Sequence, residues 1–188
     1  MYVSQVTIKE LEKIYGSPKT ADFHIPVFQK EFDCIKKSQK HGRKHDATLY
    51  IFKDDKVIVI AKPFYPKGMY RAPSGGIKPK EDFVVGAKRE AKEETGCEIE
   101  IEHFLLKTNV VFTLFPSNNQ TIEWNSYIFQ AKYISGDFQF TDKREIREVK
   151  LATLSEFESF SKLMRQSKIG GLHYRASLHD FVKNLLIM

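Results

Sequence analysis

A short loop containing two glycines leads into a predicted helix rich in acidic residues, over residues 75–97. The spacing predicts a helix over 82–95, and at about 100° per residue Glu90, Glu93 and Glu94 fall on one arc of its surface. Like charges at this spacing repel one another, and the repulsion disappears when a hard divalent cation lies among them. The segment therefore favours a site for a divalent cation.

A plainer interpretation is a solvated acidic face. Lys88, Arg89 and Lys92 lie on the same helix and can neutralise such a face through pairs four residues apart. Residue types alone leave the two interpretations open, and the spacing of the residues has to separate them.

From Gly75 the chain reads Gly-x5-Glu-x7-Arg-Glu-x2-Glu-Glu-x-Gly. This resembles the signature of the Nudix hydrolases, in which these seven letters are fixed. Ala91 and Cys97 occupy the positions where that signature has an aliphatic residue, and Ser74 stands where the family usually has glycine. The resemblance covers roughly residues 46–160.

The resemblance implies an α/β (α+β) Nudix fold, in which a mixed β-sheet is sandwiched between helices, with an N-terminal helical extension. We expect the extension to span residues 1–45 and the Nudix hydrolase domain to span 46–188. The residue pattern predicts helices over 6–15, 26–37, 82–95, 154–164 and 176–187. It predicts strands over 47–52, 56–61, 98–104, 108–115, 121–132 and 145–151.

The resemblance also implies hydrolysis of a pyrophosphate bond in a nucleoside diphosphate linked to another group, with Mg²⁺ or Mn²⁺ as cofactor. Glu93 and Glu94 match the principal metal ligands, and Glu90 matches a third carboxylate that binds metal or accepts a proton from the attacking water. The backbone carbonyl of Ser74 matches a further ligand. Arg89 and Glu81 match an ion pair that orients the carboxylates, although a plain structural salt bridge is the alternative interpretation.

Family members often use one more glutamate from a late loop. Glu145 is our first choice for that role, Glu148 is the second and Glu123 the third; an ordinary surface acid is the alternative for Glu145. We expect the substrate to meet the loop before the signature and its two glycines. The candidate residues are Tyr65, Tyr70, Arg71, Gly75 and Gly76, with Phe115 and Trp124 as alternative stacking residues.

Charge and cysteine content limit the other classes of partner. The formal net charge is +6, and a basic run lies between Lys36 and Lys44. That run lacks interleaved aromatic residues, so a nucleic acid partner is disfavoured. His41 and His45 flank a glycine, which does not suit a helical zinc site. Cys34 and Cys97 do not make a disulfide framework, so a cytoplasmic location is expected.

We expect a small-molecule nucleotide as the partner, with no membrane span and no signal peptide. The apolar N-terminal residues, among them Phe23, Phe28, Phe32 and Ile35, need burial either as a lid on the core or as a homodimer surface. Two further hypotheses remain open. One is a Nudix-fold module that senses a nucleotide without hydrolysing it, and the other is an RNA-directed pyrophosphohydrolase.

Overall fold

The computed structural model describes residues 3–39 and 42–187, and a seven-stranded mixed sheet runs through it. The strand order is β1-β5-β6-β2-β3-β7, and β4 pairs with β2. The strands are β1 Lys19–Val27, β2 His45–Lys53, β3 Lys56–Ala61, β4 Ser74–Gly75, β5 Cys97–Leu114, β6 Thr121–Gly136 and β7 Glu148–Ala152. The helices are α1 Gln5–Tyr15, α2 Gln29–Ser38, α3 Phe83–Thr95, α4 Glu156–Arg165 and α5 Gly170–Ile187.

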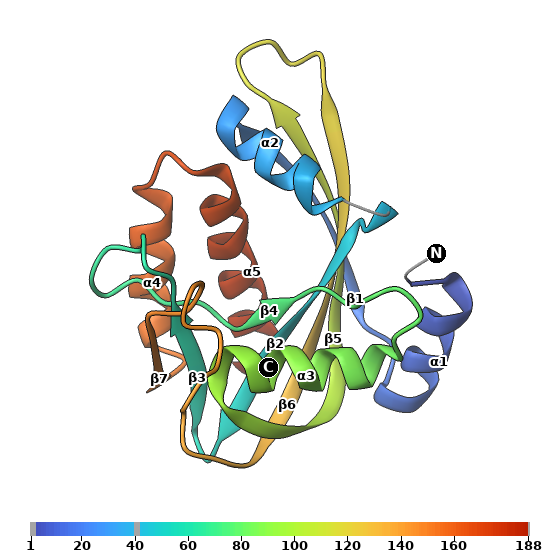
Figure 1. Ribbon diagram of the computed structural model, residues 1–188, viewed down its shortest axis with the longest axis vertical. Coiled ribbons are helices and arrows are strands. Elements are labelled where there is room, and N and C mark those ends of the chain that lie inside the picture. Colours follow the sequence, from blue (N-terminus) through green and yellow to red (C-terminus); the bar gives the residue numbers. More distant parts are fainter. Residues whose placement is uncertain (1–2, 40–41, 188) are drawn as a thin grey trace.

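Helices cover both faces of the sheet (Figure 1). One apolar core lies between the sheet and helices α1 and α3, and the other lies between the sheet and helices α2, α4 and α5. Alternation along β2 explains the two cores, because Leu49 and Ile51 belong to the first and Tyr50 to the second. The expected sandwich of a mixed sheet between helices is confirmed.

The hairpin and the acidic helix form where the sequence predicts them. Asp54 has φ 55°, the left-handed conformation that a two-residue hairpin turn requires. Asp82 caps α3 by accepting a hydrogen bond from the N–H of Val85 at 3.0 Å. Gly96 ends the helix with φ 76°, where a side chain would also meet the backbone of Gln139.

The N-terminal segment differs from the prediction of a helix over 26–37. Pro26 lies in β1, an edge strand that pairs in parallel with β5, and α2 begins only at Gln29. An edge strand tolerates proline because one side of it carries no ladder hydrogen bonds. Phe28 is the N-cap residue and is exposed, so it is not on a buried helical face.

Three further boundaries were wrong. The two strands predicted over 98–104 and 108–115 form one strand, β5, whose pairing with β6 is interrupted by irregularities. The last strand begins at Glu148 rather than at residue 145. The last helix begins at Gly170 rather than at residue 176, because its glycines take part in the first turn.

The N-terminal helices bury some of their apolar side chains within this chain, while Val6 and Ile14 of α1 are exposed. Ile8 and Leu11 of α1 pack on one core, and Phe32 of α2 packs on the other. Their burial therefore does not require a second subunit, and the homodimer stays a prediction. No helix in the described ranges is long and apolar enough to cross a membrane.

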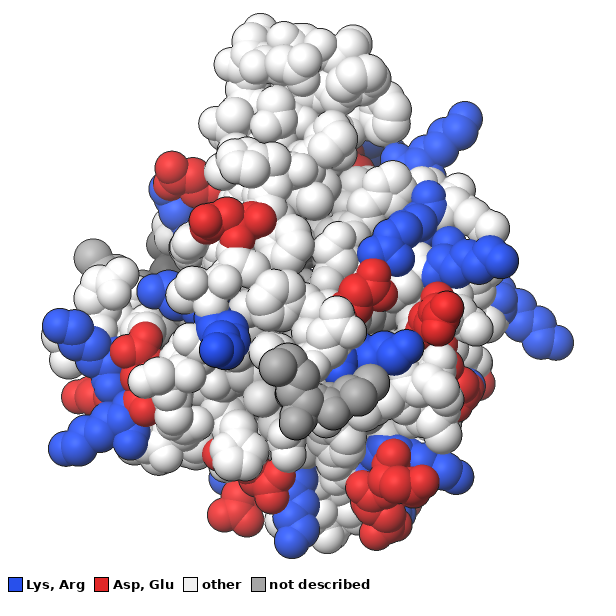
Figure 2. Space-filling view, turned by 180° about the vertical axis from the view of Figure 1, so that it is seen from behind, with Lys and Arg blue, Asp and Glu red and all other residues white. Residues whose placement is uncertain are grey.

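Basic and acidic side chains are intermixed on the face shown in Figure 2, and the projecting tip of the molecule carries neither. A nucleic acid groove needs a stripe of one sign, and this face has none. Two members of the basic run, Lys40 and His41, lie outside the described residues.

Candidate active site

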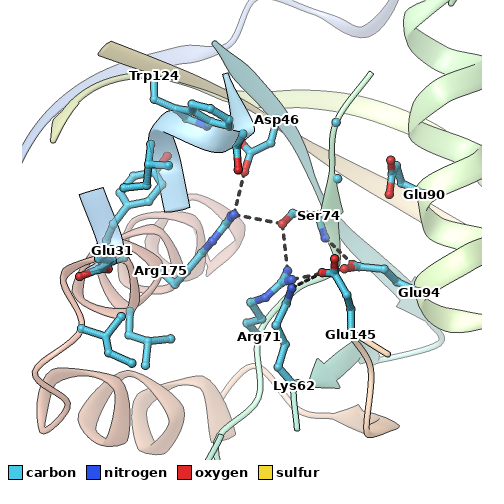
Figure 3. A pocket seen from close by; sticks show the side chains of 18 of the residues that line it. Glu31, Asp46, Lys62, Arg71, Ser74, Glu90, Glu94, Trp124, Glu145 and Arg175 are labelled. Carbon is cyan, nitrogen blue, oxygen red and sulfur yellow. Dashed lines mark hydrogen bonds and ion pairs between the residues drawn. The ribbon is translucent and has the colours of Figure 1, made fainter. Parts of the chain in front are cut away.

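A cavity of about 510 Å³ lies beside the glycine loop and the acidic helix. Strand β4 holds the loop in place, because Gly75 pairs with Ala47 of β2. Helix α3 packs against the sheet through Ala87 and Ala91, both fully buried, and small side chains there bring the helix close. The carboxylates of Glu90 and Glu94 are thereby placed at the wall of the cavity (Figure 3).

Glu94 is buried and tightly held. Its Oε2 accepts a hydrogen bond from the backbone N–H of Ser74 at 2.8 Å, and its Oε1 lies 3.3 Å from Nη2 of Arg71. Burial raises the pKa of Glu94, while Arg71 opposes the shift. A buried carboxylate that also faces a cavity needs positive charge nearby, which a guanidinium or a metal ion can supply.

Glu90 occupies the space that a side chain on Gly75 would fill. A Cβ built on Gly75 would lie 2.1 Å from the carboxyl carbon of Glu90, so a side chain there would displace this carboxylate. Burial raises the pKa of Glu90, and the nearby Glu94 and Glu93 add to the shift. The Nη1 of Arg89 donates to Glu90 Oε1 at 2.9 Å and opposes it.

Arg89 and Glu81 form the ion pair that the resemblance implies. The guanidinium bonds both oxygens of Glu81, at 2.8 Å from Nε and 2.9 Å from Nη2. The same Nη2 donates to the carbonyl of Gly76 at 3.1 Å, which ties the loop to the helix. The hydrogen bond from Arg89 holds the pKa of Glu81 below its usual range. This geometry fits an orienting role, which stays a prediction.

Glu93 is more exposed than Glu90 and Glu94. Its side chain is 44% exposed, does not line the cavity, and pairs with Nη1 of Arg89 at 3.2 Å. Among residues 3–39 and 42–187, no three acidic, histidine or cysteine side chains form a group that could hold a metal ion in this conformation. Glu90 and Glu93 both accept hydrogen bonds from Nη1 of Arg89, at 2.9 and 3.2 Å, so the guanidinium offsets the repulsion between these two acids.

Of the three late glutamates, only Glu145 lines the cavity among the described residues. Its Oε2 accepts a hydrogen bond from Nζ of Lys62 at 2.6 Å, and this bond lowers the pKa of Glu145. The carboxylate of Glu123 lies 3.7 Å from Nζ of Lys44.

The predicted substrate residues divide between the cavity and the core. The cavity-lining members are Tyr65, Arg71, Gly75, Gly76 and Trp124, and the predicted metal ligand Ser74 lines it as well. Tyr70 does not line it and instead packs on Phe160, with 5.4 Å between ring centroids. Phe115 is exposed and meets the ring of Phe28 rather than the cavity.

Six charged residues that line the cavity were not singled out from the sequence as site residues. They are Glu31, Arg43, Asp46, Lys62, Asp142 and Arg175. Arg175 reaches from α5 and donates to Asp46 Oδ2 at 2.7 Å, Thr48 Oγ1 at 2.9 Å and Ser74 Oγ at 3.0 Å. Arg175 and Asp46 are far apart in sequence, and no local spacing connects them.

Comparisons with known proteins agree with this geometry. A family model described as the NUDIX domain matches residues 42–170. Among solved structures, a NUDIX hydrolase from Nitrosomonas europaea is 18% identical, with a TM-score of 0.50 over 64% of this chain and 79% of that one. This likeness supports the fold. Among curated proteins, no significant match was found.

Two other similar structures carry more specific names. An ADP-ribose pyrophosphatase from Streptococcus suis is 16% identical, with a TM-score of 0.43 over 60% of this chain and 75% of that one. A UDP-X diphosphatase is 15% identical, with a TM-score of 0.47 over 74% of this chain and 73% of that one.

Proposed function

Because the chain belongs to the Nudix family of pyrophosphohydrolases, we propose that it hydrolyses the pyrophosphate bond of a nucleoside diphosphate derivative with the help of Mg²⁺ or Mn²⁺. One observation carries this proposal. The carboxylates of Glu90, Glu94 and Glu145 come from two separate parts of the chain and line one cavity. A solvated acidic face on α3 would not require the buried position of Glu94.

The residues at the cavity fit a divalent cation. Glu90 and Glu94 supply the oxygen ligands that Mg²⁺ and Mn²⁺ prefer, and burial leaves both carboxylates in need of positive charge. The absence of a side chain at Gly75 leaves the space in which Glu90 sits. We assign Glu90, Glu94 and the carbonyl of Ser74 to the cation, and Glu93 joins them if its side chain leaves Arg89.

A bound cation would withdraw charge from the phosphates and make the attacking water more acidic. The chain itself supplies the group that takes the proton. Glu90 suits that role better than Glu145, because burial raises the pKa of Glu90 while Lys62 lowers the pKa of Glu145. Glu145 then serves to hold Lys62 at the cavity wall.

Cationic side chains at the cavity suit the phosphate oxygens of the substrate. Lys62, Arg43, Arg71 and Arg175 all line it. Guanidinium groups match phosphate geometry through paired donors. Arg71 and Arg175 also hold one another in place, because both donate to the hydroxyl of Ser74, at 2.9 and 3.0 Å.

The proposal also includes the cellular location and the domain division of the enzyme. The described cysteines are free, Cys34 exposed and Cys97 buried, which agrees with the expected cytoplasmic location. We also retain the division into an extension over 1–45 and a hydrolase domain over 46–188, with β1 of the extension added to the edge of the domain's sheet.

A product-resolved screen tests the function. The full chain is incubated with ADP-ribose, dinucleotides, nucleoside triphosphates, nucleotide sugars and coenzyme A, each with Mg²⁺ or Mn²⁺. We expect cleavage of the pyrophosphate bond of at least one compound, and loss of that cleavage in the Glu93→Gln, Glu94→Gln double variant. Turnover no higher than that of the double variant on every compound would contradict the proposal. Tight binding without product would point instead to a sensing module.

A further inference from the structure

One side of the cavity is built from residues outside the range that the family model matches. We call it the α2–α5 wall. Its members are Glu31, Ile35 and Ser38 from α2, and Gly171, Leu172, Tyr174 and Arg175 from α5. In Figure 3, Glu31 lies on the opposite side of the view from Glu90 and Glu94. The wall therefore faces the part of a substrate that extends away from the reacting bond.

The wall is closed by a direct tie between its two helices. The carboxylate of Glu31 accepts hydrogen bonds from the N–H groups of Gly170 at 3.1 Å and Gly171 at 2.6 Å. These groups open helix α5, where a phosphate would otherwise find free donors. Because Glu31 already occupies them with a negative charge, this end of the cavity disfavours a phosphate group.

The remaining surface at this end suits a flat, uncharged group. Ile35 and Leu172 contribute aliphatic side chains, and Phe112 and Trp124 contribute aromatic rings. Aromatic walls bind nucleobases through their faces and edges, largely irrespective of which base is present.

Asp46 adds a polar requirement to this surface. The residue lines the cavity beside Trp124 and is only 7% exposed (Figure 3). Its Oδ2 accepts the hydrogen bond from Arg175, while its Oδ1 is shielded from bulk water and has no hydrogen-bond partner among the described residues. A buried carboxylate oxygen without a donor is costly, so a ligand that supplies an N–H or O–H gains affinity here.

We propose that the α2–α5 wall binds the nucleoside of the substrate, and that Asp46 accepts a hydrogen bond from that nucleoside, from either a base amino group or a ribose hydroxyl. This inference rests on the proposed function and names the part of the substrate that decides selectivity. A nucleoside monophosphate carries the same groups without the reacting bond, so its binding tests the inference without any turnover.

The test measures binding of AMP, CMP, GMP and UMP to the full chain by titration calorimetry. The tightest ligand is then compared with analogues that lack its base amino group, its 2′-hydroxyl or its 3′-hydroxyl. We expect one of these deletions to weaken binding about tenfold or more. The deletion that does so identifies whether the base or the ribose supplies the donor.

The variant Asp46→Asn separates recognition from a structural role. Arg175 donates to this side chain, so the amide oxygen must face Arg175 and the NH₂ group must replace Oδ1. In this variant, we expect the analogue that lacks the donor group to bind as tightly as the complete monophosphate, because the new NH₂ group cannot accept a hydrogen bond. The matched control Thr48→Val removes another acceptor of Arg175 but does not line the cavity, so the penalty should persist there.

Absence of monophosphate binding, or an equal deletion penalty in wild type and Asp46→Asn, would overturn the inference. Hydrolysis assays on the same preparations keep its failure distinct from that of the proposed function. Cleavage without the Asp46-dependent preference refutes only the inference. The preference without cleavage refutes only the hydrolytic function.

Discussion

The two sides of the cavity are held together by contacts of different range. On the side of the glycine loop and α3, Arg89 pairs with Glu81, eight residues away. On the α2–α5 wall, Glu31 contacts Gly171 across 140 residues, and Arg175 contacts Asp46 across 129. The acids of α3 are thus oriented largely within one short segment, whereas the second side forms only once the whole chain has folded. Reaction chemistry and substrate fit are assigned to separately built parts.

Among the variants, we expect Glu94→Gln to separate the two sides most clearly, because it should lower the rate of hydrolysis without changing nucleoside binding. The variant keeps the shape of the buried side chain but removes the negative charge that a cation requires. We expect kcat/KM to fall at least about 100-fold, while affinity for a nucleoside monophosphate changes little.

Steady-state kinetics on the best substrate of the screen, with calorimetry alongside, measure both effects. The control is Glu98→Gln, an acid of β5 that only forms an exposed pair with Lys92. It should keep wild-type kinetics. A loss of activity in Glu94→Gln of only a few-fold would mean that the buried carboxylate does not hold the cation.

The loss of folding stability at low pH tests the packing of α5, the helix that contributes to the α2–α5 wall. His179 of α5 is buried, its ring nitrogens have no hydrogen-bond partner among the described residues, and burial lowers its pKa from 6.5 to about 3. The folded state therefore holds it neutral, and stability is lost as the pH falls below 6.5, where the unfolded chain takes up a proton. Because of this residue, we expect the free energy of unfolding to be about 2 kcal/mol lower at pH 5 than at pH 7.

Urea unfolding at the two pH values measures that loss, and His179→Leu should remove about 2 kcal/mol of the difference. His45, whose pKa burial lowers to about 4, accounts for part of what remains. An unchanged pH dependence in His179→Leu would show that the imidazole is not held neutral in the folded protein.

The smallest effect is expected from Glu31→Gln. An amide oxygen retains one acceptor for the N–H groups of Gly170 and Gly171 but loses the charge that favours a helix N-terminus. We expect a loss of about 1 kcal/mol in unfolding free energy, measured by urea titration. The matched change Glu158→Gln affects an exposed pair with Lys183 and should shift stability by less than about 0.5 kcal/mol. Equal changes in unfolding free energy in the two variants would show that the contact of Glu31 with Gly170 and Gly171 has no special role in stability.

The sequence predicts the side formed by the glycine loop and α3 well, because the residues that determine it are close along the chain. The caps of α3, the Asp54 turn and the spacing of Glu81 and Arg89 each report their own local structure. Where prediction fails, a distant contact decides. Pro26 lies in a strand because β5 is available to pair with it, and Gly170 begins a helix because Glu31 satisfies its N–H.

The same reasoning explains the site residues that the sequence missed. Asp46 follows a histidine at the start of a strand, and Arg175 lies in a helix with no flanking motif, so neither stands out. Their place in the site comes from the fold, in which Arg175 donates hydrogen bonds to both Asp46 and Ser74. Glu93 is the opposite case: its place in the signature predicts a metal ligand, its side chain pairs with Arg89 here, and its role as a ligand stays a prediction.

The close approach at Gly170 has one more consequence. A methyl group there would lie 2.2 Å from the carbonyl oxygen of Pro26, so the beginning and the end of the chain meet at a point with no spare room. A protein trimmed to residues 42–170 would keep every acid of the signature and lose one whole flank of its binding chamber. Changes confined to the two chain ends can therefore alter which molecules such an enzyme accepts while its bond-breaking apparatus stays the same.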